Sequence, residues 1–198
     1  MTNPNRPRPS FATAGGWPLF AVVAVVAAVV DLATKSALFR RLGMPGERPG
    51  IVLVPGVLAL ETNLNEGALF GMGQGMGIFF AGVSCLAIGG ILLLVSRRAT
   101  RDDPWVLLAL ALITGGIVGN LYDRLGLPGL AWHAPLSRVG RPVFAVRDWI
   151  HFRLEGIIDW PIFNLADSWL VIGAGLLVLL SLRAPPAEAQ AAAEGQTE

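Results

Sequence analysis

Four apolar stretches of membrane-spanning length constrain this chain more than any other feature. They cover residues 11–38, 75–96, 104–124 and 160–182, and the first contains a charge-free run from Phe11 to Val30. A helix needs about 20 predominantly apolar residues to cross a bilayer core about 30 Å thick, so each stretch is long enough. The sequence therefore predicts four membrane-spanning helices.

The composition agrees with an integral membrane protein. Of 198 residues, 54% are hydrophobic and 15% are charged, and the mean hydropathy is +0.60. Soluble domains carry about 25% charged residues. The formal net charge of +1 gives no electrostatic case for binding nucleic acid. The single cysteine, Cys85, cannot form an internal disulfide or a cysteine-rich metal site.

The segments outside the apolar stretches divide the rest of the chain. Residues 11–184 are predicted to form one membrane domain, and the polar tails 1–10 and 185–198 are predicted to be disordered. Residues 49–72 alternate β-branched residues with Pro and Gly, which indicates short strands and turns. Four spans place both termini on one side of the membrane. Short flanks on that side are rich in arginine, which favours a cytoplasmic location for the termini; these residues are Arg6, Arg8, Arg97, Arg98, Arg101 and Arg183.

Polar residues gather at the ends of the stretches that lie away from the termini. Charged groups inside membrane spans are costly and usually functional, so their segregation to one side favours one composite site. Asp148, in the segment before the fourth stretch, lies on the same side. The clusters are Asp31 with Lys35, Asn63 with Asn65, Asn120 with Asp123 and Arg124, and Asn164 with Asp167.

Sequence spacing predicts some local contacts within these clusters. Asp31 and Lys35 are four residues apart with the acid first, the favourable order for a pair on one helix face. Asn164 and Asp167 are three apart, so the amide can hydrogen-bond and orient the carboxylate. Gly115 and Gly119 form a small-xxx-small pair, which allows close approach of a neighbouring helix.

Several carboxylates on one side favour acid–base chemistry. Two carboxylates that face each other share a proton, so one can activate water while the other polarises an amide carbonyl. This is the chemistry of aspartic proteases, and it needs no cofactor. The sequence has no HExxH or GxSxG pattern and no histidine pair at metal-ligand spacing, which argues against zinc and serine hydrolases. His133 and His151 are predicted to be solvated loop residues.

Five short motifs follow one another along the chain. They are Asp31 to Lys35 (D-x-x-x-K), Asn65 to Gly71 (N-x-G-A-x-F), Gly115 to Arg124 (G-G-x-x-G-N-x-x-D-R), Val146 to Ile150 (similar to apolar-apolar-D-F-I) and Phe163 to Ser168 (F-N-x-A-D-S). Taken in this order, they resemble the motifs of the lipoprotein signal peptidase family (signal peptidase II), and the resemblance runs from Asp31 to about Leu182. Each motif is weak alone, and the order of five makes the resemblance specific.

The resemblance implies a catalytic pair, Asp148 and Asp167, and a structural role for Asp123 or a role in holding Arg124. It implies an all-α integral membrane fold of four transmembrane helices with a small extracytoplasmic β-cradle, no cofactor and no metal. Its substrate would be a diacylglyceryl-modified prolipoprotein, cut on the N-terminal side of the lipidated cysteine. The enzyme would be a multi-pass monomer among phospholipids of the bacterial inner membrane, with its active site near the extracytoplasmic face. The expected substrate-binding or supporting residues are Asp31, Lys35, Asn65, Gly67, Asn120, Arg124 and Asn164.

Two features depart from the family pattern. Residues 125–145 are longer than the family's connection, and they are interpreted as an insertion that partly covers the site or extends the lid that closes on substrate. Arg147 replaces a usually apolar neighbour of the catalytic acid. Adjacent residues of an extended segment point differently, so Arg147 need not pair with Asp148. Asp159 has similar flanks and is the rival to Asp148 for the catalytic role.

Two other classes of function remain open from the sequence. Buried carboxylates also serve proton relays, so a small proton-coupled transporter is the main alternative. A non-catalytic membrane adaptor is the other. A relay needs polar groups near the middle of the membrane, whereas an adaptor would not depend on either acid.

Overall fold

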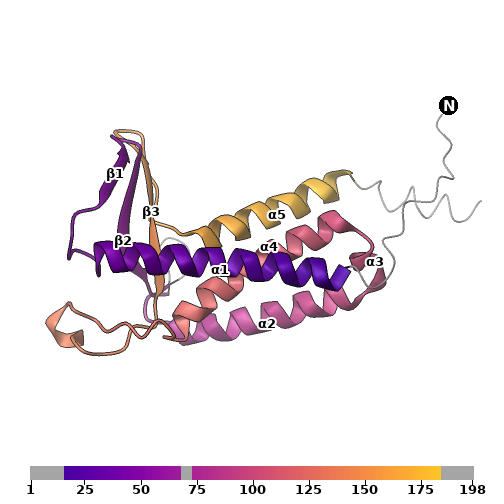
Figure 1. The fold of residues 1–198 in the computed structure, drawn as a ribbon, viewed down its shortest axis with the longest axis horizontal. Helices are drawn as coiled ribbons and strands as arrows, with labels where there is room; N and C mark the ends of the chain where they lie inside the picture. The colour runs from indigo at the N-terminus through magenta and orange to yellow at the C-terminus, as the bar shows by residue number, and fades with distance from the viewer. Residues whose placement is uncertain (1–15, 68–72, 184–198) are drawn as a thin grey trace, which may run out of the picture.

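The computed structural model describes residues 16–67 and 73–183. Four long helices lie side by side, and a small sheet stands across one end of them (Figure 1). All four are long and apolar enough to cross a membrane, which confirms the prediction of four spans. The predicted tails and the first residues of the first stretch lie outside the described residues. The helices are α1 (Gly16–Leu42), α2 (Gly77–Ser96), α4 (Pro104–Arg124) and α5 (Leu165–Arg183).

Two helix ends differ from the predicted stretches. Helix α1 continues to Leu42, and α5 begins at Leu165 instead of residue 160. The chain before α5 is extended because the Phe163 carbonyl accepts hydrogen bonds from the backbone N–H groups of Trp149 and Ile150, at 3.0 and 2.8 Å. Backbone that is committed to a strand in this way cannot also continue a helix.

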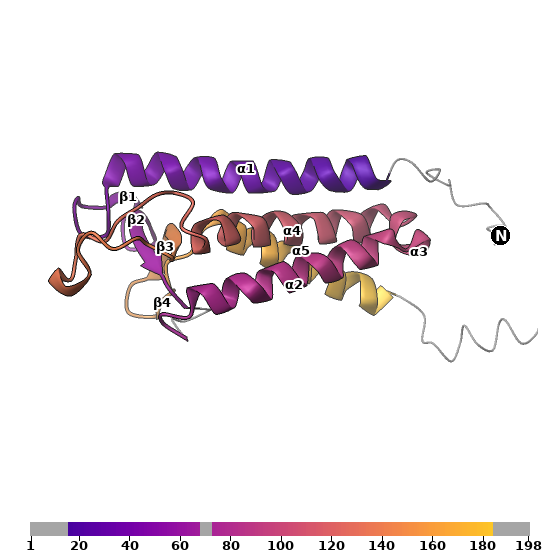
Figure 2. The ribbon, with the colours of Figure 1, turned by 90° about the horizontal axis from the view of Figure 1, so that it is seen from below.

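Helix α4 is the centre of the bundle, and it packs against α1, α2 and α5 (Figure 2). Its N-terminus is capped by Asp103, whose carboxylate accepts the N–H groups of Trp105 and Val106, and a short helix α3 (Arg98–Arg101) precedes it. A methyl group on Gly115 would lie 2.6 Å from the Ala27 Cβ of α1. This contact confirms the predicted small-residue face of α4.

The sheet contains four antiparallel strands in the order β1-β2-β3-β4. The expected label all-α is therefore too loose, because the fold contains this sheet as well as the four helices. Strands β1 and β2 fall within the predicted segment 49–72, of which residues 68–72 lie outside the described part of the chain. The two later strands come from the segment before α5. The strands are β1 (Ile51–Val54), β2 (Leu58–Asn65), β3 (Val146–Leu154) and β4 (Ile158–Asp159).

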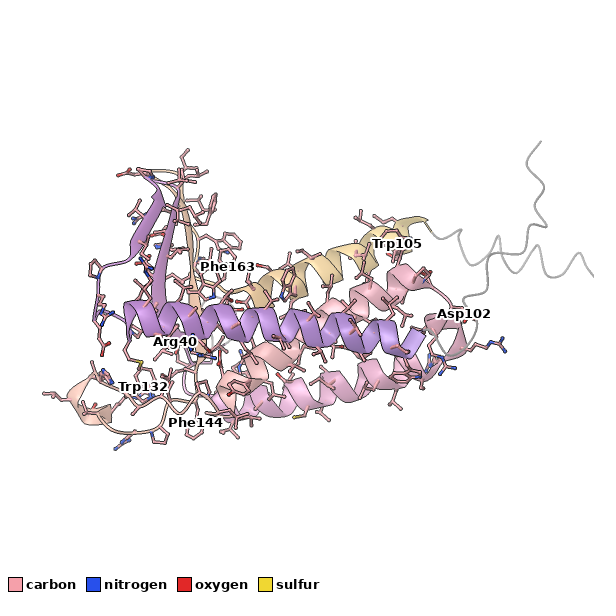
Figure 3. All side chains as sticks on the ribbon, viewed as in Figure 1. Arg40, Asp102, Trp105, Trp132, Phe144 and Phe163 are labelled. Carbon is pink, nitrogen blue, oxygen red and sulfur yellow. The ribbon has the colours of Figure 1, made fainter. Side chains whose placement is uncertain are left out.

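Residues 125–145 form a looped-out hairpin between α4 and β3. An isolated antiparallel bridge joins Ala131 to Pro142, and a single 3-10 turn, Leu136–Arg138, lies near its tip. Its base packs on the end of α1, where Val143 and Trp132 contact a small apolar cluster around Phe39. Figure 3 shows Trp132 below α1 and Phe163 above it, between the sheet and α5.

Candidate active site

The N-terminus of α5 carries the first carboxylate. Asn164 lies immediately before the helix, and its Oδ1 accepts the backbone N–H of Asp167 at 3.0 Å. The Oδ2 of Asp167 accepts the backbone N–H of Asn164 at 3.2 Å. This reciprocal arrangement is a capping box, which satisfies two N–H groups that the helix leaves unpaired. The Asp167 carboxylate is thereby fixed against its own helix.

The predicted contact between the Asn164 amide and the Asp167 carboxylate is not made. The Asn164 Nδ2 instead donates to Asp148 Oδ1 at 2.6 Å and to Asn120 Oδ1 at 3.2 Å. The prediction placed both residues inside one helix, whereas Asn164 is the cap and points its amide across to β3. Asn164 therefore links the two predicted catalytic acids, through its side chain to Asp148 and through its backbone to Asp167.

Helix α1 supplies a second cap to α5. Asp31 Oδ1 accepts the Ala166 N–H at 2.9 Å, across 135 positions of sequence. The Lys35 Nζ lies 2.7 Å from Asp31 Oδ2, so the predicted pair is formed, and both side chains are completely buried. Gly119 faces Asp31 so closely that an added methyl group would overlap the carboxylate. A glycine of α4 thus creates the space for this buried acid.

Asp123 joins two cations in the same buried cluster. Its Oδ2 lies 3.1 Å from Lys35 Nζ, and its Oδ1 lies 2.8 Å from Arg147 Nε. The expectation that Asp123 would hold Arg124 gives way to this pairing. Arg147 also donates to Ser36 Oγ at 3.2 Å, so it turns away from Asp148 as strand alternation predicts. Each buried charge therefore has an opposite partner, as burial requires.

Asn120 connects this ionic cluster to the two acids. Its Oδ1 accepts Lys35 Nζ at 2.8 Å, and its Nδ2 donates to Asp167 Oδ1 at 2.8 Å. With the backbone bond from Asn164, both oxygens of Asp167 accept N–H donors. These donors hold the Asp167 carboxylate in a fixed orientation.

Asp148 lies on β3, opposite Asn63 of β2 in the strand register. It is 1% exposed and hydrogen-bonds the side chains of Asn164 and Asn65. Burial, together with the nearby charge of Asp167, raises the pKa of Asp148 to about 8. The two predicted catalytic acids therefore lie close together and differ in environment, which is the arrangement that separates an acid from a base.

A cavity of about 580 Å³ adjoins Asp167. Asp167, Asn120 and Asn65 line it directly, whereas Asp148 is buried behind them. Most of its wall is apolar and comes from α4, α5 and the segment before α5, including Ile117, Leu170 and Val171. A carboxylate at the wall of an apolar cavity is the usual form of a ligand or reaction site.

Arg124 lines this cavity and contacts Gly67, which follows β2. The Arg124 Nη2 donates to the Gly67 carbonyl at 3.3 Å, and its guanidinium lies 5.6 Å from the centre of the Phe80 ring. Its Nε is buried without a hydrogen-bond partner among the described residues. Asn65 Oδ1 accepts the Gly67 N–H at 3.0 Å and closes the turn. All nine predicted site residues are thus brought to one end of the bundle.

Asp159, the rival to Asp148, lies elsewhere. It is on β4, its side chain is 74% exposed, and its Oδ1 lies 2.6 Å from His151 Nε2. The other ring nitrogen of His151 contacts Glu61 of β2. His151 is therefore a part-buried bridge between two strands, and its description as a solvated loop residue was wrong. His133 is more than half exposed and contacts Glu47.

The insertion does not cover the cavity, because no residue of 125–145 lines it.

No pattern in the sequence indicated that Arg147 and Asp123 would pair, since their contact depends on how β3 crosses the end of α4. Within residues 16–67 and 73–183, no group of three His, Cys, Asp or Glu side chains is placed to hold a metal ion.

The fold and the site define a class: an integral membrane protein with two linked carboxylates at one end of its helical bundle. The family model of signal peptidase (SPase) II matches residues 23–183. The chain belongs to the signal peptidase II family. Membership makes it a peptidase, and the four spans make it a multi-pass protein of the bacterial inner membrane.

Individual relatives agree with this assignment. A lipoprotein signal peptidase from Rhodopirellula baltica is 39% identical over 173 residues, which cover 85% of this chain and 73% of the relative. Another from Symbiobacterium thermophilum is 35% identical over 158 residues, or 80% and 90% of the two chains. A solved structure of a bacterial membrane enzyme has a TM-score of 0.68 over 84% of this chain and 88% of its own, at 23% identity. That similarity concerns the fold.

Proposed function

We propose that this chain is an aspartic endopeptidase that removes the signal peptide from diacylglyceryl-modified prolipoproteins, cutting on the N-terminal side of the lipidated cysteine. The substrate class follows from its relatives, which are named lipoprotein signal peptidases. The observation that carries the mechanism is the linkage of Asp148 and Asp167 through Asn164. One acid is buried and the other faces an apolar cavity.

The two acids take different roles. Asp167 accepts N–H bonds on both oxygens and lines the cavity, where water can reach it, so it takes the role of the base. Asp148 has its pKa raised to about 8, chiefly by burial, so it is protonated at neutral pH and acts as the acid. Asn120 and Asn164 orient the pair, and the buried Lys35 holds Asn120 in place.

The reaction proceeds through a tetrahedral diol. Asp167 takes a proton from water as the water oxygen attacks the scissile carbonyl carbon, and Asp148 gives its proton to the carbonyl oxygen. Asp167 then returns its proton to the amide nitrogen while Asp148 takes a proton from one hydroxyl of the diol. The C–N bond breaks, and a carboxylic acid and an amine leave. Both acids regain their initial protonation states.

The cavity suits a substrate that is anchored in the membrane. Its apolar wall faces the region between α4 and α5, where the signal helix and the acyl chains of the substrate can lie beside the two acids. Arg124 lines the cavity, so its guanidinium supplies N–H donors for a substrate carbonyl. A monomer contains every residue that the mechanism uses.

The proposed orientation puts the sheet on the extracytoplasmic side. The two ends of the described chain lie at the opposite end of the bundle (Figure 1), next to the arginine-rich α2–α4 connection, which the positive-inside rule assigns to the cytoplasm. The buried charged residues of the spans are Asp31, Lys35 and Asp123, and all lie in the half nearest the sheet. Their segregation argues against a proton path across the bilayer.

Cleavage of a diacylglyceryl-modified prolipoprotein in detergent tests this proposal. The native protein, Asp148→Asn, Asp167→Asn and the control Asp159→Asn are compared, with folding checked by thermal unfolding of each. We expect product from the native protein and Asp159→Asn, and at least a thousandfold loss in the other two. Cleavage by a folded Asp148→Asn or Asp167→Asn variant would remove that acid from the mechanism. A native protein inactive on a substrate that a known lipoprotein signal peptidase cleaves would refute the proposed function.

A further inference from the structure

The hairpin 125–145 reaches back to the end of β2 through one arginine. Arg138, in the 3-10 turn of the hairpin, grips Glu66 with two nitrogens: its Nη1 lies 2.8 Å from Oε2, and its Nη2 contacts Oε1. The guanidinium also stacks over the Trp132 ring, 3.9 Å from the ring centre. A forked arginine held by an aromatic ring loses little freedom when it pairs, so its position is well defined.

Glu66 occupies a sensitive position in the chain. The preceding residue, Asn65, hydrogen-bonds the buried Asp148, and the following residue, Gly67, accepts a hydrogen bond from Arg124. The turn is closed by the bond from the Gly67 N–H to Asn65 Oδ1. A movement of Glu66 would therefore shift together a partner of the catalytic acid and the arginine that lines the cavity.

We propose that Arg138 is a positioning residue, which holds the Asn65–Gly67 turn against Asp148 and Arg124 by gripping Glu66. The inference rests on the proposed function of the two acids. The hairpin thus holds this turn in position although it does not line the cavity. The bridge is partly solvated, with 34% and 18% of the two side chains exposed, and partly exposed ion pairs contribute little to stability. Its effect is therefore on the geometry of the site.

The electrostatics of Glu66 are consistent with this role. The hydrogen bonds from Arg138 lower the pKa of Glu66, so the glutamate stays ionised throughout the neutral range. Arg141, three residues further along the hairpin, is exposed, and its described hydrogen bonds involve only its backbone, whose N–H donates to the Arg138 carbonyl and whose carbonyl accepts the Trp132 N–H. Arg141 is thus a matched control that has the same charge in the same segment.

The test measures cleavage of the diacylglyceryl-modified substrate in detergent by Arg138→Ala, by Glu66→Gln and by a charge-swapped double variant, Arg138→Glu with Glu66→Arg. The control variant is Arg141→Ala. We expect kcat to fall about tenfold in the first two variants, with KM changed less than twofold. In the charge-swapped double variant kcat should recover. The hydrogen bond from Asn65 lowers the pKa of Asp148. Its loss in Arg138→Ala should therefore move the alkaline limb of the pH profile to higher pH.

Hydrogen exchange gives a readout that does not need activity. The Gly67 amide should exchange at least fivefold faster in Arg138→Ala than in the native protein, and unchanged in Arg141→Ala. An unchanged exchange rate of the Gly67 amide in Arg138→Ala would overturn the proposed positioning role of Arg138. A folded Arg138→Ala variant with native kcat and pH profile would overturn it too. A charge-swapped double variant whose kcat stays as low as that of Arg138→Ala would overturn it as well. If the native protein cleaves nothing, the proposed function fails, and the hydrogen-exchange rates alone decide whether Arg138 positions the turn.

Discussion

Two ionic clusters in this protein have similar geometry and different surroundings. The inner cluster is Asp31, Lys35, Asp123 and Arg147, at the sheet end of the helices. The outer cluster is Glu61, His151 and Asp159, across three strands of the sheet. The inner distances are 2.7 to 3.1 Å, and the outer Asp159 contact is 2.6 Å. The inner side chains are at most 4% exposed, whereas Asp159 is 74% exposed.

The comparison shows that the distance between two charged groups does not by itself decide how much their ion pair contributes to stability. Exposed pairs are screened by water and contribute about 0 to 1 kcal/mol. Removing one partner of a buried pair leaves an uncompensated charge and costs about 3–5 kcal/mol. The inner cluster therefore fixes the position of α5 and Asn120, and the outer cluster has little control over the site.

Lys35→Met should have the largest effect on stability. It leaves Asp31 and Asp123 with one cation between them, and we expect the free energy of unfolding to fall by about 3–5 kcal/mol. Thermal unfolding in detergent measures this. Arg98→Met is a matched control, because Arg98 and Asp102 are also four residues apart in a helical segment but are largely exposed. Equal losses in both variants would contradict the distinction between the clusters.

Gly119→Ala should have the next largest effect. The added methyl group would overlap the Asp31 carboxylate, and overpacking in a tight site costs about 1–3 kcal/mol. Gly90 of α2 has open space around the same position, so Gly90→Ala should stay within about 1 kcal/mol of the native protein. Denaturation of both variants checks the prediction. A stable Gly119→Ala variant would show that α1 and α4 can separate without cost.

The pH dependence of cleavage should distinguish buried Asp148 from exposed Asp159. Asp148 must be protonated to act as the acid, and its pKa is raised to about 8 by burial and by Asp167. We therefore expect kcat/KM to fall about tenfold per pH unit above pH 8, as the acid loses its proton. The Asp159→Asn variant should show the same profile. A profile that stays flat to pH 10 would mean that Asp148 is not the acid.

His151→Gln should have the smallest effect. Burial opposes the charged form, but the hydrogen bonds that His151 donates to Asp159 and Glu61 dominate and raise the pKa of His151. A raised histidine pKa contributes stability at low pH, which is complete below the unfolded value of about 6.5 and is lost as pH rises through the folded value. We expect a deficit below about 1 kcal/mol at pH 5.5 and a smaller one at pH 9. Denaturation at both pH values measures it, and a larger deficit at pH 9 would reverse the assigned sign.

Local patterns in the sequence predicted the elements of this site. The apolar stretches predicted four spanning helices, and the four-residue spacing of Asp31 and Lys35 predicted their ion pair. The Gly115 and Gly119 spacing predicted a close helix contact. These features depend on the period of one helix, which a sequence displays directly. The catalytic roles of Asp148 and Asp167 stay a prediction until the variants are measured.

The tertiary structure alone decided which distant residues meet. The register of β2 and β3 places Asp148 beside Asn63 and Asn65, and the crossing of β3 over α4 pairs Arg147 with Asp123. The position of Asn164 before α5 turns its amide to Asp148. A one-residue change of register would point every side chain of a strand to the other face. Such choices depend on how whole elements pack, because contacts across 16 to 135 positions leave no periodic signal in the sequence.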